Sequence, residues 1–245
     1  MTEKRLLKTV PLLVATICAV LVGLATAFAA EIPFITTDEL KKKMDAAAPL
    51  VLADALSSIE HNEMAIKGSV NIPASKVKGN SNLPADKGKL LIFYCKGPKC
   101  GKSRIAAEEA VKLGYTNVMV YNEGLPEWAK RGYEVVAKTA YPKVEIPRMT
   151  PKEVADQRAS LVLVDIRGEK HMDLGKIGGT VNILLDDMDT QYTRLPKDKK
   201  LVLTDHAGKQ LLVAAKFLHM KGYTNVAIMD GGVTAWIQAG LPVSK

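Results

Sequence analysis

Cysteine, histidine and aromatic residues are scarce in this chain of 245 residues. It has three cysteines and four histidines, and Phe, Trp and Tyr together make up 5% of it. The histidines are scattered with no metal-site spacing, so we predict no metal and no cofactor. Low-complexity tracts are absent too, and 47% hydrophobic with 24% charged residues is typical of a folded protein. The length suits two α/β domains of about 100 residues each.

A dense basic stripe is also absent, although the formal net charge is +8. Residues 1–29 contain three basic residues and one acidic residue, which leaves 31 basic and 25 acidic residues in the rest. This modest excess is spread along the chain and is not interleaved with aromatic residues. It favours small anions as partners and predicts no nucleic-acid binding.

One apolar run stands out, residues 10–27, and it follows a short basic N-terminus. Small residues end the run at Ala27 and Ala29, in the pattern that a signal peptidase reads. We therefore predict a signal peptide over residues 1–29, cleaved after Ala29, and a periplasmic or secreted protein with no stable membrane span after cleavage. The alternative is an uncleaved N-terminal anchor, because the run approaches the length of a membrane-spanning helix.

The remaining sequence is one unit written twice. Gly-Tyr-Thr-Asn-Val occurs at 114–118 and again at 222–226, and Trp128 recurs as Trp236 at the same offset of 108. Other matches, at an offset of 111, pair Asp54 with Asp165 and residues 68–72 with 179–183. The drift in offset indicates small insertions or deletions in surface loops.

The sequence predicts the same order of helices and strands in both copies. Thr36 with Glu39, and Thr150 with Glu153, are capping-box patterns that open a helix. Short apolar runs then predict buried parallel strands at 50–53, 90–94 and 118–121 in copy one, and at 161–164, 201–204 and 226–229 in copy two. Alanine-containing helices are predicted at 103–113 and 209–220. We predict an α/β fold with two tandem domains, copy one (30–140) and copy two (141–245), each a mainly parallel sheet flanked by helices.

The segment after the central strand of copy one is the predicted site. In open α/β sheets, ligands bind beyond the carboxyl ends of the strands, where Cys95 stands. Glycines let the backbone N–H groups turn inward to hold an anion, and the following helix adds its positive end. Such surroundings lower the pKa of a thiol. The predicted site comprises the catalytic Cys95 and the substrate-binding Lys96, Gly97, Lys99, Cys100, Gly101, Lys102, Arg104 and Asp54.

These residues resemble the rhodanese-like (sulfurtransferase) superfamily, over essentially everything after the predicted signal. The resemblance rests on Asp54, residues 68–73, the strand-Cys95-loop-helix unit and the tail from Gly124 through Trp128. It implies that Cys95 accepts a sulfane sulfur from a donor such as thiosulfate and passes the sulfur on as a persulfide. The acceptor is not identified by the sequence, and a protein thiol is one candidate.

Two departures from the family pattern separate the copies. The family commonly has arginine two residues after the first-strand aspartate, where copy one has Leu56 and copy two has Arg167. Copy two has Asp205 in place of the cysteine. A carboxylate cannot carry sulfane sulfur and repels an anionic donor, so we predict that copy two is catalytically inactive.

The role of Cys100 stays open at this stage. It is a candidate resolving thiol, the second half of a structural disulfide with Cys95, or a small loop residue. Two other functions also compete with sulfur transfer: a thiol redox protein that cycles Cys95 and Cys100, and a non-catalytic binding module. A phosphatase is disfavoured, because the related phosphatases have arginine at the sixth position after the cysteine, where this chain has Gly101.

Overall fold

The computed structural model describes residues 31–168 and 172–244, and residues Ile32–Lys245 form one compact unit. The predicted signal peptide lies outside the described residues. Within the described ranges, no helix has the length and apolar character needed to cross a membrane. The expected signal, its cleavage and the expected destination of the protein therefore remain predictions.

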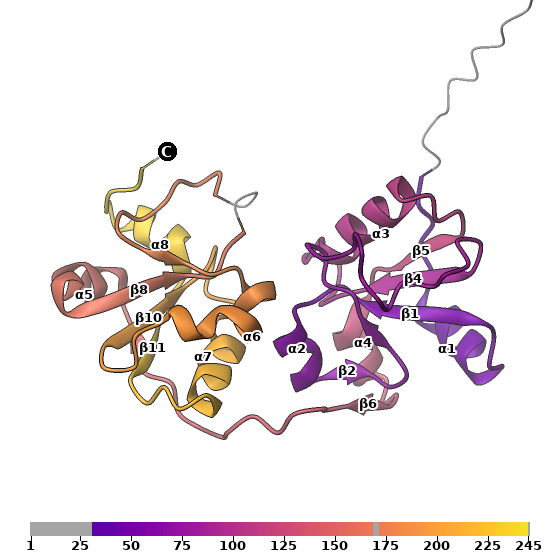
Figure 1. The fold of residues 1–245 in the computed structure, drawn as a ribbon, viewed down its shortest axis with the longest axis horizontal. Helices are drawn as coiled ribbons and strands as arrows, with labels where there is room; N and C mark the ends of the chain where they lie inside the picture. Colours follow the sequence, from indigo (N-terminus) through magenta and orange to yellow (C-terminus); the bar gives the residue numbers. More distant parts are fainter. Residues whose placement is uncertain (1–30, 169–171, 245) are drawn as a thin grey trace, which may run out of the picture. The chain divides into compact units, whose positions relative to one another are not determined.

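Copy one contains a four-stranded sheet in the order β3-β1-β4-β5, in which all pairings are parallel (Figure 1). A short antiparallel pair, β2 with β6, lies apart from this sheet. The elements of copy one are α1 (Thr37–Asp45), β1 (Leu50–Asp54), α2 (Ser58–Glu63), β2 (Ala65–Ile66), β3 (Val70–Asn71), β4 (Leu90–Tyr94), α3 (Lys102–Lys112), β5 (Val118–Tyr121), α4 (Gly124–Lys130) and β6 (Val135–Val136).

Copy two repeats this arrangement with one more edge strand, in the order β7-β11-β10-β8-β9, again all parallel. Its helices and strands are β7 (Arg148–Met149), α5 (Pro151–Asp156), β8 (Leu161–Asp165), β9 (Val181–Asn182), α6 (Met188–Gln191), β10 (Lys200–Thr204), α7 (Leu211–Met220), β11 (Val226–Met229) and α8 (Gly232–Gln238). Short 3-10 turns cover 158–160, 185–187 and 192–194.

The α/β class and the parallel sheets expected from the sequence are confirmed. Both predicted capping boxes form: Thr36 and Thr150 each accept from the backbone N–H three residues on, and Glu39 and Glu153 bond back. The long helices differ from prediction only at their ends. Gly101 and Gln210 precede α3 and α7 without a side-chain capping hydrogen bond, so the sequence carried no clear start signal for these helices.

The sheet of copy one is buried on both faces, which explains its continuous apolar strands. Along β4, Leu91 and Phe93 pack on one side with the alanines of α3, whereas Ile92 and Tyr94 pack on the other side with Trp128. Alternating side chains along one strand therefore feed two separate cores. The Trp128 indole is buried and donates to the Glu134 carbonyl at 3.1 Å. The tryptophan of the repeated tail thus anchors a core.

Candidate functional site

Cys95 directly follows β4, with β1 on one side of that strand and β5 on the other. Parallel pairing brings the carboxyl ends of these strands to one edge, where Asp54 is in register with Tyr94. The Cys95 residue is 1% exposed, and its carbonyl accepts from Leu125 N–H at the start of α4 at 2.9 Å. The nucleophile expected from the sequence therefore lies where ligands of open α/β sheets bind.

The loop from Cys95 to α3 curls around the Cys95 sulfur. Gly97 and Gly101 have φ angles of +99° and +73°, a left-handed conformation that glycine adopts without strain. The Cys100 N–H donates to the Gly97 carbonyl at 2.9 Å and closes the turn between them. On the helix side, the Ser103 hydroxyl lies 3.3 Å from the Cys95 sulfur. Ser103 is a site residue that the sequence analysis missed, and its place in the first turn of α3 was the available signal.

These surroundings favour the charged form of Cys95. The Cys100 side chain contributes most, and together with the Ser103 hydroxyl and the Ser103 and Gly97 amides it outweighs burial and lowers the pKa of Cys95 to about 6. In contrast, the neighbouring Cys95 and burial raise the pKa of Cys100. Both cysteines are free thiols. At pH 7 the pair is therefore one thiolate, Cys95, beside one thiol, Cys100.

Replacing Cys100 with alanine should raise the pKa of Cys95, because it removes the largest interaction that stabilises the thiolate. In the wild-type protein, the rate of Cys95 alkylation by iodoacetamide should rise through about pH 6 and level off. In Cys100→Ala the midpoint should move up, toward the ordinary value of about 8.5 for a thiol. Peptide mapping of the alkylated cysteine at each pH measures this, and identical midpoints in the two proteins would contradict the assignment.

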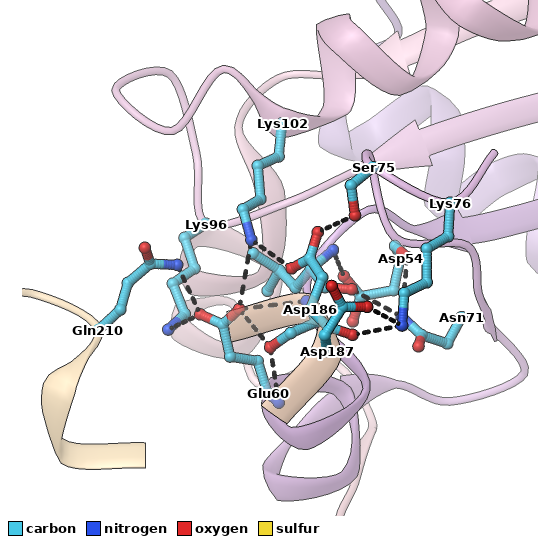
Figure 2. Close-up of polar contacts among 12 residues, drawn as sticks. Asp54, Glu60, Asn71, Ser75, Lys76, Lys96, Lys102, Asp186, Asp187 and Gln210 are labelled. Carbon is cyan, nitrogen blue, oxygen red and sulfur yellow. Dashed lines mark hydrogen bonds and ion pairs between the residues drawn. The ribbon is translucent and has the colours of Figure 1, made fainter. Parts of the chain in front are cut away.

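Two of the predicted substrate-binding lysines are held by carboxylates. Figure 2 shows Lys96 and Lys102 converging on Glu60 of α2, at 2.7 Å and 3.7 Å. Lys102 also lies 3.0 Å from Asp186 of copy two, and Gln210 of copy two donates to Glu60 at 3.2 Å. Sequence patterns placed positive charge in the loop but gave no sign of the two acidic partners. The net positive charge available to a ligand here is thus smaller than the count of lysines implies.

Glu60 is the centre of this cluster and is 3% exposed. Burial acts to raise the pKa of its carboxyl, but attraction to Lys102 and then Lys96, with hydrogen bonds from Lys96 and Ser57, lowers it to about 2. Burial and the attraction of Asp186 and Glu60 act on Lys102 in opposite directions, and the net effect raises the pKa of that lysine. Buried charges that are paired on several sides keep this part of the loop in place.

Glu60→Gln should lower the free energy of unfolding by about 3 kcal/mol at pH 7, because it removes the buried charge whose pKa Lys102 and Lys96 lower to about 2, although Lys102 keeps its ion pair with Asp186. The folded-state pKa lies below the ordinary value of 4.5, so this stabilisation is fully present above about pH 4.5 and is lost as pH falls toward 2. Chemical denaturation of both proteins across this range measures the difference.

Glu63→Gln is the matched control on the same helix, because the Glu63 carboxylate pairs with Lys216 and is 33% exposed. It should cost no more than about 1 kcal/mol. Equal losses in the two variants at pH 7 would contradict a special role for Glu60.

The other two predicted cations lie differently. Arg104 pairs with Glu108 one turn along α3 at 3.2 Å and stands over the Phe34 ring. Lys99 is exposed in the middle of the loop. The assignment of these residues, and of Lys96 and Lys102, to substrate binding stays a prediction.

Asp54 organises the turn between β1 and α2. It is fully buried, accepts from the Leu56 N–H at 3.0 Å, and lies 2.9 Å from His61 Nδ1. In copy two, the matching Asp165 lies 2.7 Å from Arg167 Nη2. His61, which sequence reasoning passed over, therefore stands in copy one where the common pattern uses arginine. Because His61 belongs to α2, its contact with Asp54 helps to hold that helix, whose Glu60 accepts from Lys96.

In copy two, the anion-holding loop is filled by the chain itself. One Asp205 carboxylate oxygen accepts from the N–H groups of Ala207, at 3.0 Å, and Gly208, and the other accepts from Gln210 N–H at 2.8 Å. A carboxylate thus occupies the backbone nest at the position that matches Cys95. The loop of copy two is therefore filled by a side chain of the protein itself, and Asp205 leaves no thiol at this position.

Comparison with known proteins agrees with this geometry. The family model for the rhodanese-like domain matches residues 36–131 and again residues 150–239. The chain belongs to the rhodanese-like domain family. Each of its two rhodanese-like domains is a mainly parallel sheet flanked by helices, as the sequence predicted.

Several known proteins are similar to parts of this rhodanese-like chain. A sulfurtransferase of Allochromatium vinosum is 29% identical over 83 residues, covering 34% of this chain and 78% of that protein. The thiosulfate sulfurtransferase GlpE of Ectopseudomonas mendocina is 28% identical over 93 residues, covering 38% of this chain and 85% of GlpE. Among solved structures, a thiosulfate sulfurtransferase of Pseudomonas aeruginosa aligns with 87% of this chain and 43% of its own, at 19% identity and a TM-score of 0.41. The sequence relatives support a sulfurtransferase-type function.

Proposed function

We propose that this protein is an exported sulfurtransferase, which moves a sulfane sulfur from a small anionic donor such as thiosulfate to a thiophilic acceptor. In the first half-reaction, the Cys95 thiolate attacks the outer sulfur of thiosulfate and releases sulfite. In the second half-reaction, an acceptor nucleophile removes that sulfur and restores the thiolate. Copy two takes no part in the chemistry, because Asp205 stands at its matching position.

The observation that supports this proposal most is the thiolate-stabilising loop around Cys95. The sulfur lies beside the first turn of α3 and the Gly97 turn, with its pKa lowered to about 6. Backbone N–H groups aimed at one place stabilise the charge that develops on the sulfur and on the departing sulfite. The matching loop of copy two holds the Asp205 carboxylate in this way, which supports an anionic occupant in copy one.

Steady-state transfer from thiosulfate to cyanide tests the proposed activity, with sulfite and thiocyanate measured together. Equal amounts of both products, with a rate that follows the ionisation of Cys95, are expected. Absence of both products across several sulfane donors, with Cys95 shown to be reduced, would overturn the proposal.

Export is proposed on the sequence of residues 1–29 alone. A protein expressed with this segment in a Gram-negative host should be recovered from the periplasmic fraction with Ala30 as its first residue. Retention in the membrane fraction with the N-terminus intact would support the uncleaved anchor instead.

A further inference from the structure

The loop after β4 holds two thiols that differ in exposure. The Cys95 residue is 1% exposed, whereas Cys100 is half-buried. A small acceptor such as cyanide needs little room to reach a buried persulfide. A thiol on the surface of a folded protein cannot reach a buried sulfur, because the rest of that protein is too large to approach it. The exposed side of this loop therefore presents Cys100 to a large acceptor, and not Cys95.

Backbone amides of one loop influence both sulfurs. The N–H groups of Gly97 and Ser103 act on the Cys95 sulfur, and those of Lys96 and Lys102 act on the Cys100 sulfur. The turn from Gly97 carbonyl to Cys100 N–H folds the second thiol back toward the first. An outer sulfur added to Cys95 and a sulfur added to Cys100 would thus both be held as anions within the same loop.

We propose that Cys100 is a second sulfur station, to which the buried Cys95 persulfide passes its sulfane sulfur before delivery to a bulky acceptor such as a protein thiol. The inference rests on the proposed function, since it requires Cys95 to be loaded first.

The transfer balances within the loop. The Cys95 persulfide anion takes the proton of the Cys100 thiol, and the Cys100 thiolate then attacks the outer sulfur of the protonated persulfide. The sulfur–sulfur bond to Cys95 breaks, Cys95 leaves as a thiolate, and a persulfide remains on Cys100. No oxidant or reductant is consumed. Cys95 is a good leaving group for this step, because its surroundings lower the pKa of its thiol and so stabilise the departing thiolate.

Mapping the position of the sulfur tests the relay directly. The full-length protein is loaded with thiosulfate, freed of donor, alkylated with iodoacetamide and digested with trypsin. Lys96 and Lys99 place the two cysteines on different tryptic peptides, residues 90–96 and 100–102. In the wild type, part of the added sulfur should be on peptide 100–102. In Cys95→Ser, none should be there.

A comparison of acceptors provides the second readout. Cys100→Ser keeps a hydroxyl donor beside Cys95 but cannot carry sulfane sulfur. The readout is the ratio of two rates for each preloaded protein, the rate toward ubiquitin with one engineered surface cysteine divided by the rate toward cyanide. Because the ratio compares two acceptors within one protein, an effect of the substitution on Cys95 itself cancels. The ratio should be at least tenfold lower in Cys100→Ser than in the wild type, and circular dichroism of both proteins shows that the variant is folded.

Sulfur confined to peptide 90–96 in the wild type, with the same ratio of the two rates in both proteins, would overturn the relay and leave the proposed function intact. A disulfide between Cys95 and Cys100 with sulfide released would also overturn it, because the attack would then be on the inner sulfur. Failure of the wild type to load at all would instead refute the proposed function.

Discussion

Replacing Cys95 with serine should reduce sulfur transfer from thiosulfate by at least about a thousandfold, the scale of losing a covalent nucleophile. A serine hydroxyl is not ionised at neutral pH and forms no persulfide. Copy two cannot compensate, because Asp205 fills its own loop and offers no thiol. The rate of sulfite release from thiosulfate, measured with cyanide as acceptor, checks this.

Cys100→Ser is the control for a general disturbance of the loop. It changes a thiol to a hydroxyl at the other cysteine, and it should keep far more turnover with cyanide than Cys95→Ser, because Cys95 is still present to accept the sulfur. A Cys95→Ser protein with more than about a tenth of wild-type turnover would contradict the assignment of Cys95 as the nucleophile that attacks thiosulfate.

Gly124→Ala should displace the loop that follows Cys95, although Gly124 lies outside that loop, and should lower the free energy of unfolding by about 4 kcal/mol. Gly124 starts α4 at φ +71°, and an added Cβ would lie 2.4 Å from the Cys95 carbonyl oxygen and 2.6 Å from Gly97 N. Both are backbone atoms, so the loop itself must shift. The expected cost combines about 1–2 kcal/mol for a left-handed non-glycine residue with about 1–3 kcal/mol for overpacking. Turnover should fall at least tenfold, because the shift of the loop also displaces the hydrogen bond that the Leu125 N–H donates to the Cys95 carbonyl.

Gly132→Ala is the matched control, since Gly132 has φ +73° but nothing within 4 Å of an added Cβ. It should cost only the conformational part, about 1–2 kcal/mol, and leave turnover unchanged. Denaturation and steady-state rates of both variants give the comparison. Equal losses of stability and activity in the two variants would show that the close contact with the loop is not the reason why position 124 requires glycine.

The fold was accessible from the sequence because its signals are local. Capping boxes at Thr36 and Thr150 and continuous apolar strands each report on their own segment, and the repeat supplies every one of them twice. The position of Cys95 followed from the same logic, because strand ends define the ligand edge. Family resemblance supplied the chemistry.

The partners of the predicted site were not accessible, because they depend on contacts between distant segments. Glu60 meets Lys96 across 36 residues, and Asp186 meets Lys102 across 84. His61 gave no sequence sign that it would replace an arginine beside Asp54. Charge patterns identify which groups are present in a loop, whereas only the packed structure shows which of them are already paired.

The repeat also explains how the two copies contact each other. Ser75 and Asp186 occupy matching positions at the repeat offset of 111, and the Ser75 hydroxyl donates to the Asp186 carboxylate at 2.6 Å (Figure 2). Lys76 and Asp187, the next matching pair, form an ion pair at 2.8 Å. The copies thus meet through equivalent segments, with different side chains making the contact. Copy two contributes Asp186 to Lys102 at the start of α3, one residue before the Ser103 that contacts Cys95.

The most direct test of the account is the mass of the intact protein after incubation with thiosulfate. The account predicts that the wild type gains sulfur that cyanide removes, and that Cys95→Ser gains none although Cys100 is still present. An unchanged wild-type mass with Cys95 reduced, or an equal gain in Cys95→Ser, would contradict it.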